Sequence, residues 1–294
     1  KYLADETLNI FAKYNQRLDP ILKLSQPNLS FTIEEINLGE QYLSEMGISK
    51  EASFICFHNR DSAFLDNVQS NYDWSYHDYR DSSIEKYLKA AEEMIKRGYY
   101  SIRIGSITKE KINNKNPKLI DYANNGMRSD FLDIYLSYKC HFLLCSNTGI
   151  SFPAEVFKKP IVFVNWTNPR TTPIYVRDGL VIFKKFYLKK ENRFMSFTEI
   201  INLDFITKNN TNEIFSDMGL DLIDNSSEEI LAVTKEMDDR LNGIWESSKE
   251  DEELQQMFWS LFGPGKLKSI NLLIGADYLR NNKDLLKKNV KKEF

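Results

Sequence analysis

The chain has 294 residues and 42% of them are hydrophobic, which is enough to bury a large core in one or two domains. Its formal net charge of −3 gives no overall basic field of the kind that attracts nucleic acid. The apolar runs are far shorter than the roughly 18 residues that cross a membrane, and no secretory pattern opens the sequence. We therefore predict a cytoplasmic protein without a transmembrane segment, with peripheral association at the inner face of the membrane as an alternative.

The three cysteines, Cys56, Cys140 and Cys145, all lie in apolar runs with the character of buried strands. An odd number of cysteines in such places indicates reduced core residues and no disulfides. His141 and Cys145 would share one face of a strand, but Cys140 would point to the opposite face. Because the sequence has only three histidines, no second group of ligands accompanies them, and we predict no metal site.

The first part of the chain is predicted to be helical. Apolar residues recur with helical spacing from residue 1 to residue 24. Thr32 and Glu35 then form the pattern of a capping box, which predicts a helix that ends at Gly47. The first residue is Lys1 and not methionine, so a missing upstream region is one interpretation.

From residue 52 onward, short apolar runs alternate with amphipathic segments. This alternation predicts a doubly wound parallel α/β sheet of the Rossmann-like type. The predicted strands cover residues 52–58, 100–105, 119–122, 141–145, 161–164 and 180–183. The predicted helices cover residues 84–97, 129–138 and 153–157 and, toward the C-terminus, about 196–204, 226–242, 250–262 and 270–287.

These patterns divide the chain into three parts. Residues 1–50 form a helical N-terminal segment, residues 51–185 form the Rossmann-like domain, and residues 186–294 form a mainly helical region that packs on it. The basic run at residues 184–190 is predicted to be an exposed hairpin or loop, and contact with a lipid-linked or anionic glycan acceptor is the alternative.

The segment at residues 139–165, KCHFLLCSNTGISFPAEVFKKPIVFVN, carries the clearest functional pattern. It indicates a buried strand, a polar loop, a short helix with proline in its first turn, and a second buried strand. A loop that leads from the end of a strand into a helix directs unpaired N–H groups and the positive end of the helix dipole at one place, where phosphate is the usual occupant. An ordinary crossover that binds nothing is the alternative. The loop residues are Ser146, Asn147, Thr148 and Gly149.

Polar residues also follow the predicted strand at residues 52–58. His58 and Arg60 stand at its end, and the carboxyl ends of strands in an open α/β sheet share one crevice. The planar guanidinium of Arg60 suits a bidentate contact to a phosphate. The alternative is that Arg60 forms a surface ion pair with Asp61 or Asp66.

Three further places provide candidate residues. Arg103 and Gly105 end the next predicted strand and would line the same crevice, and Arg128 lies just before a predicted helix that would reach it too. His77 lies in a loop rich in aromatic and ionisable residues and is a candidate general base, because the pKa of histidine lies near neutral pH. For that loop, the alternative is a hydrogen-bonded turn capped by Asp81.

Several of these stretches together resemble known families. The serine-containing turn, a glutamate six residues after Gly149, and a lysine–proline pair before an apolar strand are similar to the nucleotide-sugar half of GT-B glycosyltransferases. His58 and Arg60 resemble the strand-end motif of fucosyltransferases that use GDP-fucose. Over about residues 30 to 180, four stretches in order resemble a bacterial family of GT-B-type glycosyltransferases associated with surface-polysaccharide loci: HNRDSAFL, YHDYRDSSIEKYLKAAEEMIKRGYYSIRIGS, GMRSDFLDIYL and CSNTGISFPAEVFKKPIVFVN.

The resemblance implies a GT-B fold, a nucleotide-sugar donor of unspecified base, a glycan or lipid-linked acceptor, and no obligatory metal or other cofactor. It implies that residues 146–149 hold the diphosphate, that Glu155 holds the ribose hydroxyls, and that Arg60 holds the β-phosphate. Full members carry a further N-terminal Rossmann-like domain that helps to bind the acceptor. About 50 residues precede the first predicted strand here, so we expect that domain to be absent, drastically shortened or supplied by a partner.

The leading hypothesis is the transfer of a sugar from a nucleotide sugar in surface-polysaccharide synthesis. Arg60 and the loop at residues 146–149 would stabilise the departing diphosphate, and His77 would deprotonate the acceptor hydroxyl. One alternative is a non-catalytic nucleotide-binding half of a split enzyme, which a shortened N-terminal part favours. Another is a sugar-nucleotide epimerase or hydrolase, which would turn over the nucleotide sugar without an acceptor.

Overall fold

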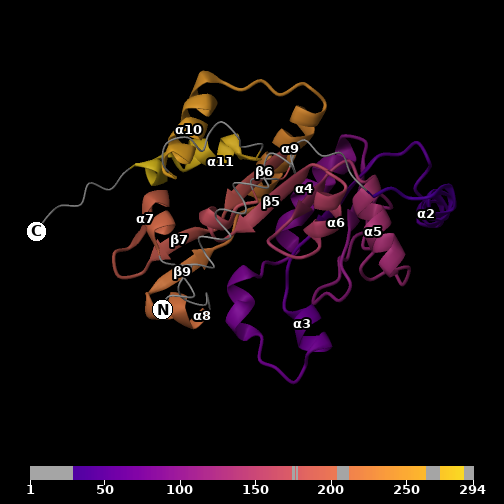
Figure 1. Ribbon diagram of the computed structural model, residues 1–294, viewed down its shortest axis with the longest axis horizontal. Coiled ribbons are helices and arrows are strands. Elements are labelled where there is room, and N and C mark those ends of the chain that lie inside the picture. Colours follow the sequence, from indigo (N-terminus) through magenta and orange to yellow (C-terminus); the bar gives the residue numbers. More distant parts are fainter. Residues whose placement is uncertain (1–28, 174–175, 177, 204–211, 263–271, 288–294) are drawn as a thin grey trace, which may run out of the picture.

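A sheet of seven parallel strands forms the centre of the protein, with helices around it (Figure 1). The computed structural model describes residues 29–173, 176, 178–203, 212–262 and 272–287. The sheet confirms the predicted parallel α/β fold. Its strands are β1 (Phe54–His58), β2 (Tyr100–Arg103), β3 (Leu119–Ile120), β4 (Leu143–Cys145), β5 (Ile161–Trp166), β6 (Gly179–Phe183) and β10 (Leu272–Ile274).

The strands of this sheet follow the order β10-β6-β5-β4-β1-β2-β3. Counted along the chain, this is the Rossmann-type order with one more strand added at the β10 edge. The order reverses between β1 and β4, which pair from Cys56 beside Leu143 to His58 beside Cys145. Connections leave these two strands in opposite directions, so a crevice is expected beyond their carboxyl ends.

The helices begin and end where the sequence provides caps. The Thr32–Glu35 capping box forms at the start of α2 (Ile33–Glu45), and the backbone of Gly47 beyond its end has a φ of +78°. Ser129 accepts a hydrogen bond from the N–H of Leu132 at the start of α5. The other helices are α3 (Ala63–Val68), α4 (Glu85–Lys96), α5 (Asp130–Lys139), α6 (Ser151–Val156), α7 (Phe197–Asn202), α8 (Asn212–Asp217), α9 (Ser227–Leu241), α10 (Lys249–Ser260), α11 (Ala276–Asn281) and the 3₁₀ turns η1 (Ser75–Arg80), η2 (Pro169–Thr171) and η4 (Lys283–Leu286).

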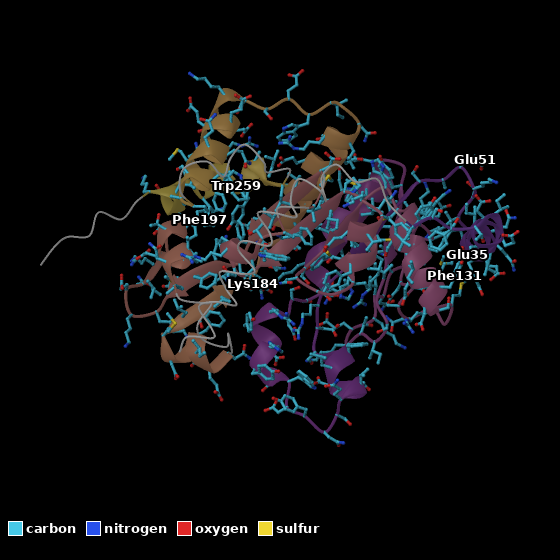
Figure 2. All side chains as sticks on the ribbon, in the orientation of Figure 1. Glu35, Glu51, Phe131, Lys184, Phe197 and Trp259 are labelled. Atoms are coloured by element: carbon cyan, nitrogen blue, oxygen red, sulfur yellow. The ribbon has the colours of Figure 1, made fainter. Side chains whose placement is uncertain are left out.

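One hydrophobic core runs through the sheet and its helices. Strands β5 and β6 are buried along their whole length, as expected for parallel strands that are covered on both faces. Helices α4 and α9 pack against each other, and α5 packs against α6. The core continues toward the C-terminal helices through Phe258, whose ring lies 5.5 Å from Phe183 and 5.1 Å from Phe197, and both Phe197 and Trp259 are buried (Figure 2).

The prediction of one helix over residues 270–287 was wrong. Leu272–Ile274 pairs with β6 as the edge strand β10, and only then do α11 and η4 follow. A short apolar run has no periodicity that separates a strand from a buried helix, so pairing with β6 decides the outcome. The predicted domain boundaries at residues 50 and 185 stay a prediction, and the predicted helix over residues 1–24 lies outside the described residues.

Two parts of the fold go beyond the predicted elements. Residues 63–80 form α3 and η1 between β1 and α4, and they extend from the body of the protein below the sheet in Figure 1. A separate antiparallel sheet has the order β8-β7-β9 and is formed by β7 (Lys185–Leu188), β8 (Arg193–Phe194) and β9 (Leu220–Ile223). The hairpin predicted for the basic run is therefore present, although Lys184 and Phe186 within it are buried.

A buried pair of asparagines joins β5 to the segment before α9. The backbone N–H of Asn165 donates to Oδ1 of Asn225 at 2.6 Å, and the backbone N–H of Asn225 donates to Oδ1 of Asn165 at 2.7 Å. The Nδ2 of Asn225 also donates to the carbonyl of Phe183 at 2.8 Å. Asn165 has a φ of +54°, a conformation that asparagine tolerates better than most residues. This pair satisfies backbone groups where β5 ends and the ladder to β6 becomes irregular.

We expect Asn225→Ala to lower the free energy of unfolding by about 2–5 kcal/mol, because it leaves the buried N–H of Asn165 without a partner and removes one of the two hydrogen bonds to the carbonyl of Phe183, which keeps the one from Tyr278. Urea denaturation followed by circular dichroism measures this change. Asn281→Ala is the control, since it removes one exposed side-chain contact to Asp277 and should change stability by less than about 0.5 kcal/mol. Equal losses in the two variants would contradict the role of Asn225.

Candidate functional site

A cavity of about 620 Å³ lies at the carboxyl ends of the strands, where the strand order reverses. Residues after β1, β2 and β4 line it, together with residues of α3, η1, α6 and η2. The structure therefore brings the ends of these three strands together, as the sequence predicted. The predicted site residues in its lining are His58, Arg60, Gly105, Asn147, Thr148, Gly149 and Glu155.

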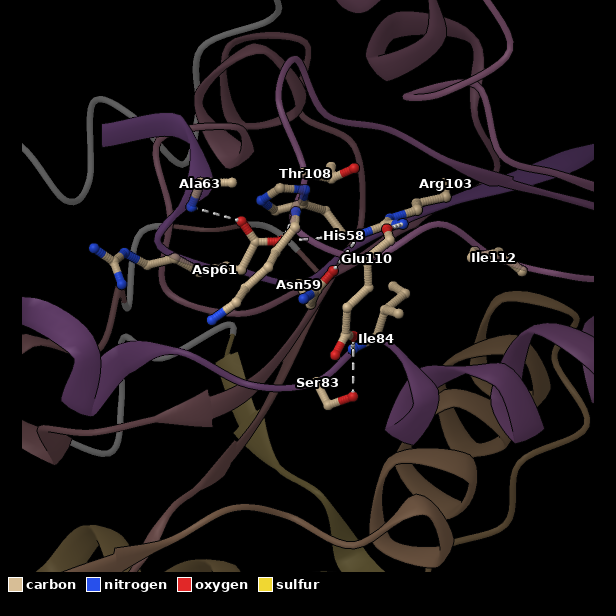
Figure 3. Close-up of polar contacts among 12 residues, drawn as sticks. His58, Asn59, Asp61, Ala63, Ser83, Ile84, Arg103, Thr108, Glu110 and Ile112 are labelled. Carbon is tan, nitrogen blue, oxygen red and sulfur yellow. Dashed lines mark hydrogen bonds and ion pairs between the residues drawn. The ribbon is translucent and has the colours of Figure 1, made fainter. Parts of the chain in front are cut away.

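Three predicted site residues are not part of this lining. Ser146 is buried, and its Oγ accepts the backbone N–H of Arg60 at 2.8 Å. Arg103 is fully buried, where it donates to the carbonyl of Glu110 and to Oδ1 of Asn59 (Figure 3). His77 packs its ring against Trp74 and Tyr76, and its Nδ1 is buried without a hydrogen bond to any described residue.

Arg60 lies at the floor of the cavity and is 7% exposed. Its Nη1 contacts the carboxylate of Asp81 and donates to the carbonyl of His77, so neither Asp61 nor Asp66 is its ion-pair partner. Burial, followed by the charge of Arg80, lowers the pKa of Arg60 to about 10. At neutral pH the guanidinium is still charged. Its Nε and Nη2 have no partner among the described residues.

His58 stands beside Arg60 as a neutral imidazole. Its Nδ1 lies 2.8 Å from the carbonyl of Ile104, so Nδ1 carries the proton and Nε2 carries the lone pair. Burial, the largest cause, lowers the pKa of His58 to about 4. A neutral imidazole in the lining of a cavity can accept a proton or a hydrogen bond, which is the role that the sequence assigned to His77.

Two arginines complete the cationic part of the lining. Arg128 forms ion pairs with Asp130 and Asp133, both at 2.9 Å. Arg80, at the last residue of η1, was not among the predicted site residues. The loop YHDYRD contains both His77 and Arg80. The sequence analysis selected His77 from it, because the pKa of histidine lies nearest to neutral pH.

The polar loop after β4 has the predicted form, but the helix that follows it is short. Helix α6 has six residues, so its dipole is a weaker attraction for an anion than a long helix would provide. Ser151 lies at its start, and the Oγ of Ser151 is 2.7 Å from Oε1 of Glu155 and 3.1 Å from the carbonyl of Thr148. Glu155 is thereby oriented within the lining, and the arginines carry most of the positive potential.

Apolar side chains surround the mouth of the cavity. Phe64 of α3, Ile107 after β2 and Phe152 of α6 line it and are each more than a third exposed, and Trp166 lies further in. Aromatic and aliphatic surface next to a charged floor suits a ligand that has both an anionic part and a flat or apolar part.

Within the described parts of the chain, no group of three or more His, Cys, Asp or Glu side chains could hold a metal ion. Over the same residues, no helix is both long and apolar enough to cross a membrane.

No family model matches the chain, and no match to a curated protein was found. Among solved structures, the glycosyl transferase family 9 protein from Veillonella parvula DSM 2008 is similar with a TM-score of 0.35 and 14% sequence identity. The match covers 53% of this chain and 42% of that one.

The low pKa of His58 predicts a pH dependence of stability. Below about pH 6.5 the unfolded chain binds a proton at His58 that the folded protein binds only near pH 4. The free energy of unfolding should therefore fall as the pH drops from about 6.5 to about 4. Part of this fall should disappear in His58→Asn. Asparagine is chosen because its amide can still donate to the carbonyl of Ile104. Urea denaturation at a series of pH values measures it. His141→Asn is the comparison: burial lowers the pKa of His141 as well, but by less, so this variant should lose a smaller part of the slope. An unchanged slope in His58→Asn would contradict the prediction.

Proposed function

We propose that this protein is a glycosyltransferase that moves a sugar from a nucleotide-sugar donor to a glycan or lipid-linked acceptor in surface-polysaccharide synthesis. The observation that carries the proposal is the cavity at the reversal point of a Rossmann-type sheet, with Arg60 in its floor and Glu155 in its wall. In sheets of this kind, nucleotides bind beyond the carboxyl ends of the strands at that point. The sequence resemblance to GT-B glycosyltransferases supports the same assignment.

The residues of the cavity suit each part of such a donor. Arg60 offers a charged, planar donor group to the diphosphate, and the loop at residues 147–149 lies beside it in the lining. Glu155 is placed to accept hydrogen bonds from the ribose hydroxyls, and Phe152 offers a face for a base or a sugar to pack on. The cationic groups would do what a divalent metal does in other glycosyltransferases, so we propose that the reaction requires no metal.

In the proposed reaction, the bond between the anomeric carbon and the diphosphate breaks, and its electron pair leaves with the diphosphate. A new bond forms between the anomeric carbon and the acceptor oxygen, whose proton must be removed. Arg60 would stabilise the developing charge on the diphosphate. His58 lines the cavity, and its Nε2 has no hydrogen bond to a described residue, so we propose that this atom, in place of His77, accepts the hydrogen bond of the acceptor hydroxyl. Because a pKa of about 4 makes His58 a weak base, the proton then passes on to water.

A thermal-shift screen tests the proposal first, using UDP, GDP, CDP, CMP, ADP and their common sugars, each with and without EDTA. A ligand at about 100 times its dissociation constant stabilises the folded state by about 2.7 kcal/mol, which raises the melting temperature by a few degrees. The bound nucleotide sugar is then incubated with glycan and lipid-linked acceptors. Transfer of the sugar supports the proposal. Turnover without acceptor would indicate an epimerase or hydrolase, and selective binding without turnover would indicate a nucleotide-binding subunit.

Glu155→Gln should weaken binding of the nucleoside diphosphate by about ten- to a hundredfold, because a neutral amide replaces the charged acceptor of the ribose hydroxyls. Pyrophosphate has no ribose, so its affinity should be unchanged or slightly higher once the negative charge is removed. Isothermal titration calorimetry measures both ligands. Glu253→Gln, on the exposed surface of α10, makes the same change away from the cavity. Equal losses for the two ligands would show that Glu155 is structural.

A further inference from the structure

Arg80 is a partly buried cation without a counter-ion. It lines the cavity, and no carboxylate oxygen of a described residue lies within 4.0 Å of its guanidinium nitrogens. Its Nε is buried and makes no hydrogen bond to any described residue. In contrast, Arg97, Arg193, Arg240 and Arg280 each pair with a carboxylate.

Arg80 and Arg60 are also electrostatically close to each other. The charge of Arg80 is the second cause, after burial, of the lowered pKa of Arg60, so the two guanidinium groups repel each other across the same cavity. Asp81 neutralises only Arg60, through its Nη1. Asp78 and Asp61 are further carboxylates whose charges act on Arg60, and burial raises the pKa of Asp78. None of these carboxylates forms an ion pair with Arg80, so its guanidinium has no direct counter-ion among the described residues.

A partly buried guanidinium without a direct counter-ion, beside a second guanidinium, is unfavourable unless an anion completes the arrangement, because burial of an unpaired charge is costly. A single phosphate can be held by one planar guanidinium. A second guanidinium beside the first gives each of two linked phosphate groups its own charged donor.

We infer that Arg80 acts together with Arg60 to bind a diphosphate, so that the ligand of this cavity carries two linked phosphate groups. The inference rests on the proposed function in that the diphosphate belongs to the donor, and it makes Arg80 the residue that favours nucleoside diphosphate sugars over nucleoside monophosphate sugars. Nucleoside monophosphate sugars would leave one of the two arginines without a partner. The exposed Ile107 and Phe152 then face the part of the ligand beyond the phosphates.

Isothermal titration calorimetry of pyrophosphate, phosphate, farnesyl diphosphate and the nucleoside mono- and diphosphates tests this inference on the full chain. Arg80→Gln should weaken pyrophosphate and the best nucleoside diphosphate by about ten- to a hundredfold, as expected for a lost charge-assisted contact. It should weaken the matching nucleoside monophosphate much less. Lys96→Gln removes the same charge at an exposed position of α4 and should leave all affinities unchanged.

The stability of the ligand-free variant separates a binding role from a structural one. Arg80 makes no ion pair and repels Arg60, so Arg80→Gln should have a melting temperature equal to or above that of the unchanged protein. A marked fall in melting temperature together with lost binding would make Arg80 structural and overturn the inference. So would equal pyrophosphate affinity in Arg80→Gln and the unchanged protein, or no pyrophosphate binding at all.

The same experiment distinguishes this inference from the proposed function. Pyrophosphate binding that depends on Arg80, without transfer from any nucleotide sugar, would support the arginine pair and reject glycosyl transfer. Tighter binding of farnesyl diphosphate than of every nucleoside diphosphate, again dependent on Arg80, would support the diphosphate site and assign it to a prenyl-linked ligand. Sugar transfer that Arg80→Gln leaves unchanged would support the function and overturn the inference.

Discussion

The hydrogen bond from the backbone N–H of Arg60 to the Oγ of Ser146 is the contact on which the site depends. It joins the segments after β1 and β4 at the point where the strand order reverses, and the N–H of Ser146 points back to the carbonyl of His58 at 3.4 Å. Beyond this point the two connections diverge, so no ladder of backbone hydrogen bonds holds them together. Ser146 therefore fixes the position of Arg60 from beneath the cavity.

Around this contact, hydrogen bonds and ion pairs hold the buried cationic side chains in place, and they leave one edge of the Arg60 guanidinium facing the cavity. Arg103 is fully buried but makes two hydrogen bonds and lies 3.7 Å from Asp121, so it supports the floor of the site. Lys184 contacts Asp224 at 2.8 Å and the carbonyl of Asp81. Asp81 is thus held from one side by Lys184 while its carboxylate orients Arg60. Such a chain of contacts lets a buried guanidinium keep one edge for a ligand.

The sequence predicted six of the seven parallel strands, because each of them is a compact apolar run, and polar residues follow as at Asn59 after β1 and Ser106 after β2. It could not show the directions of side chains beyond the strand ends. Ser146 turns away from the cavity because its Oγ accepts the buried backbone N–H of Arg60. Arg103 turns away because its guanidinium donates to the carbonyl of Glu110 and to Oδ1 of Asn59. Arg80 was missed because a 3₁₀ turn has no clear apolar period, and only the folded insertion places its last residue beside Arg60.

The segment between β1 and α4, which contains α3 and η1, contributes several of the residues that distinguish this cavity from that of a generic Rossmann-type sheet. It supplies Phe64 to the rim, the carbonyl of His77 to Arg60, and Arg80 to the lining. Asn212 of α8 holds η1 at both ends, since it accepts the N–H of Tyr79 and donates to the carbonyl of Ser75. Residues that lie more than 130 positions apart in the sequence therefore determine where Arg80 sits. Residues of α8 and β9 line a further cavity together with Asp78 and Tyr79 of η1, so a change in α8 or β9 would reach the site through the position of this turn.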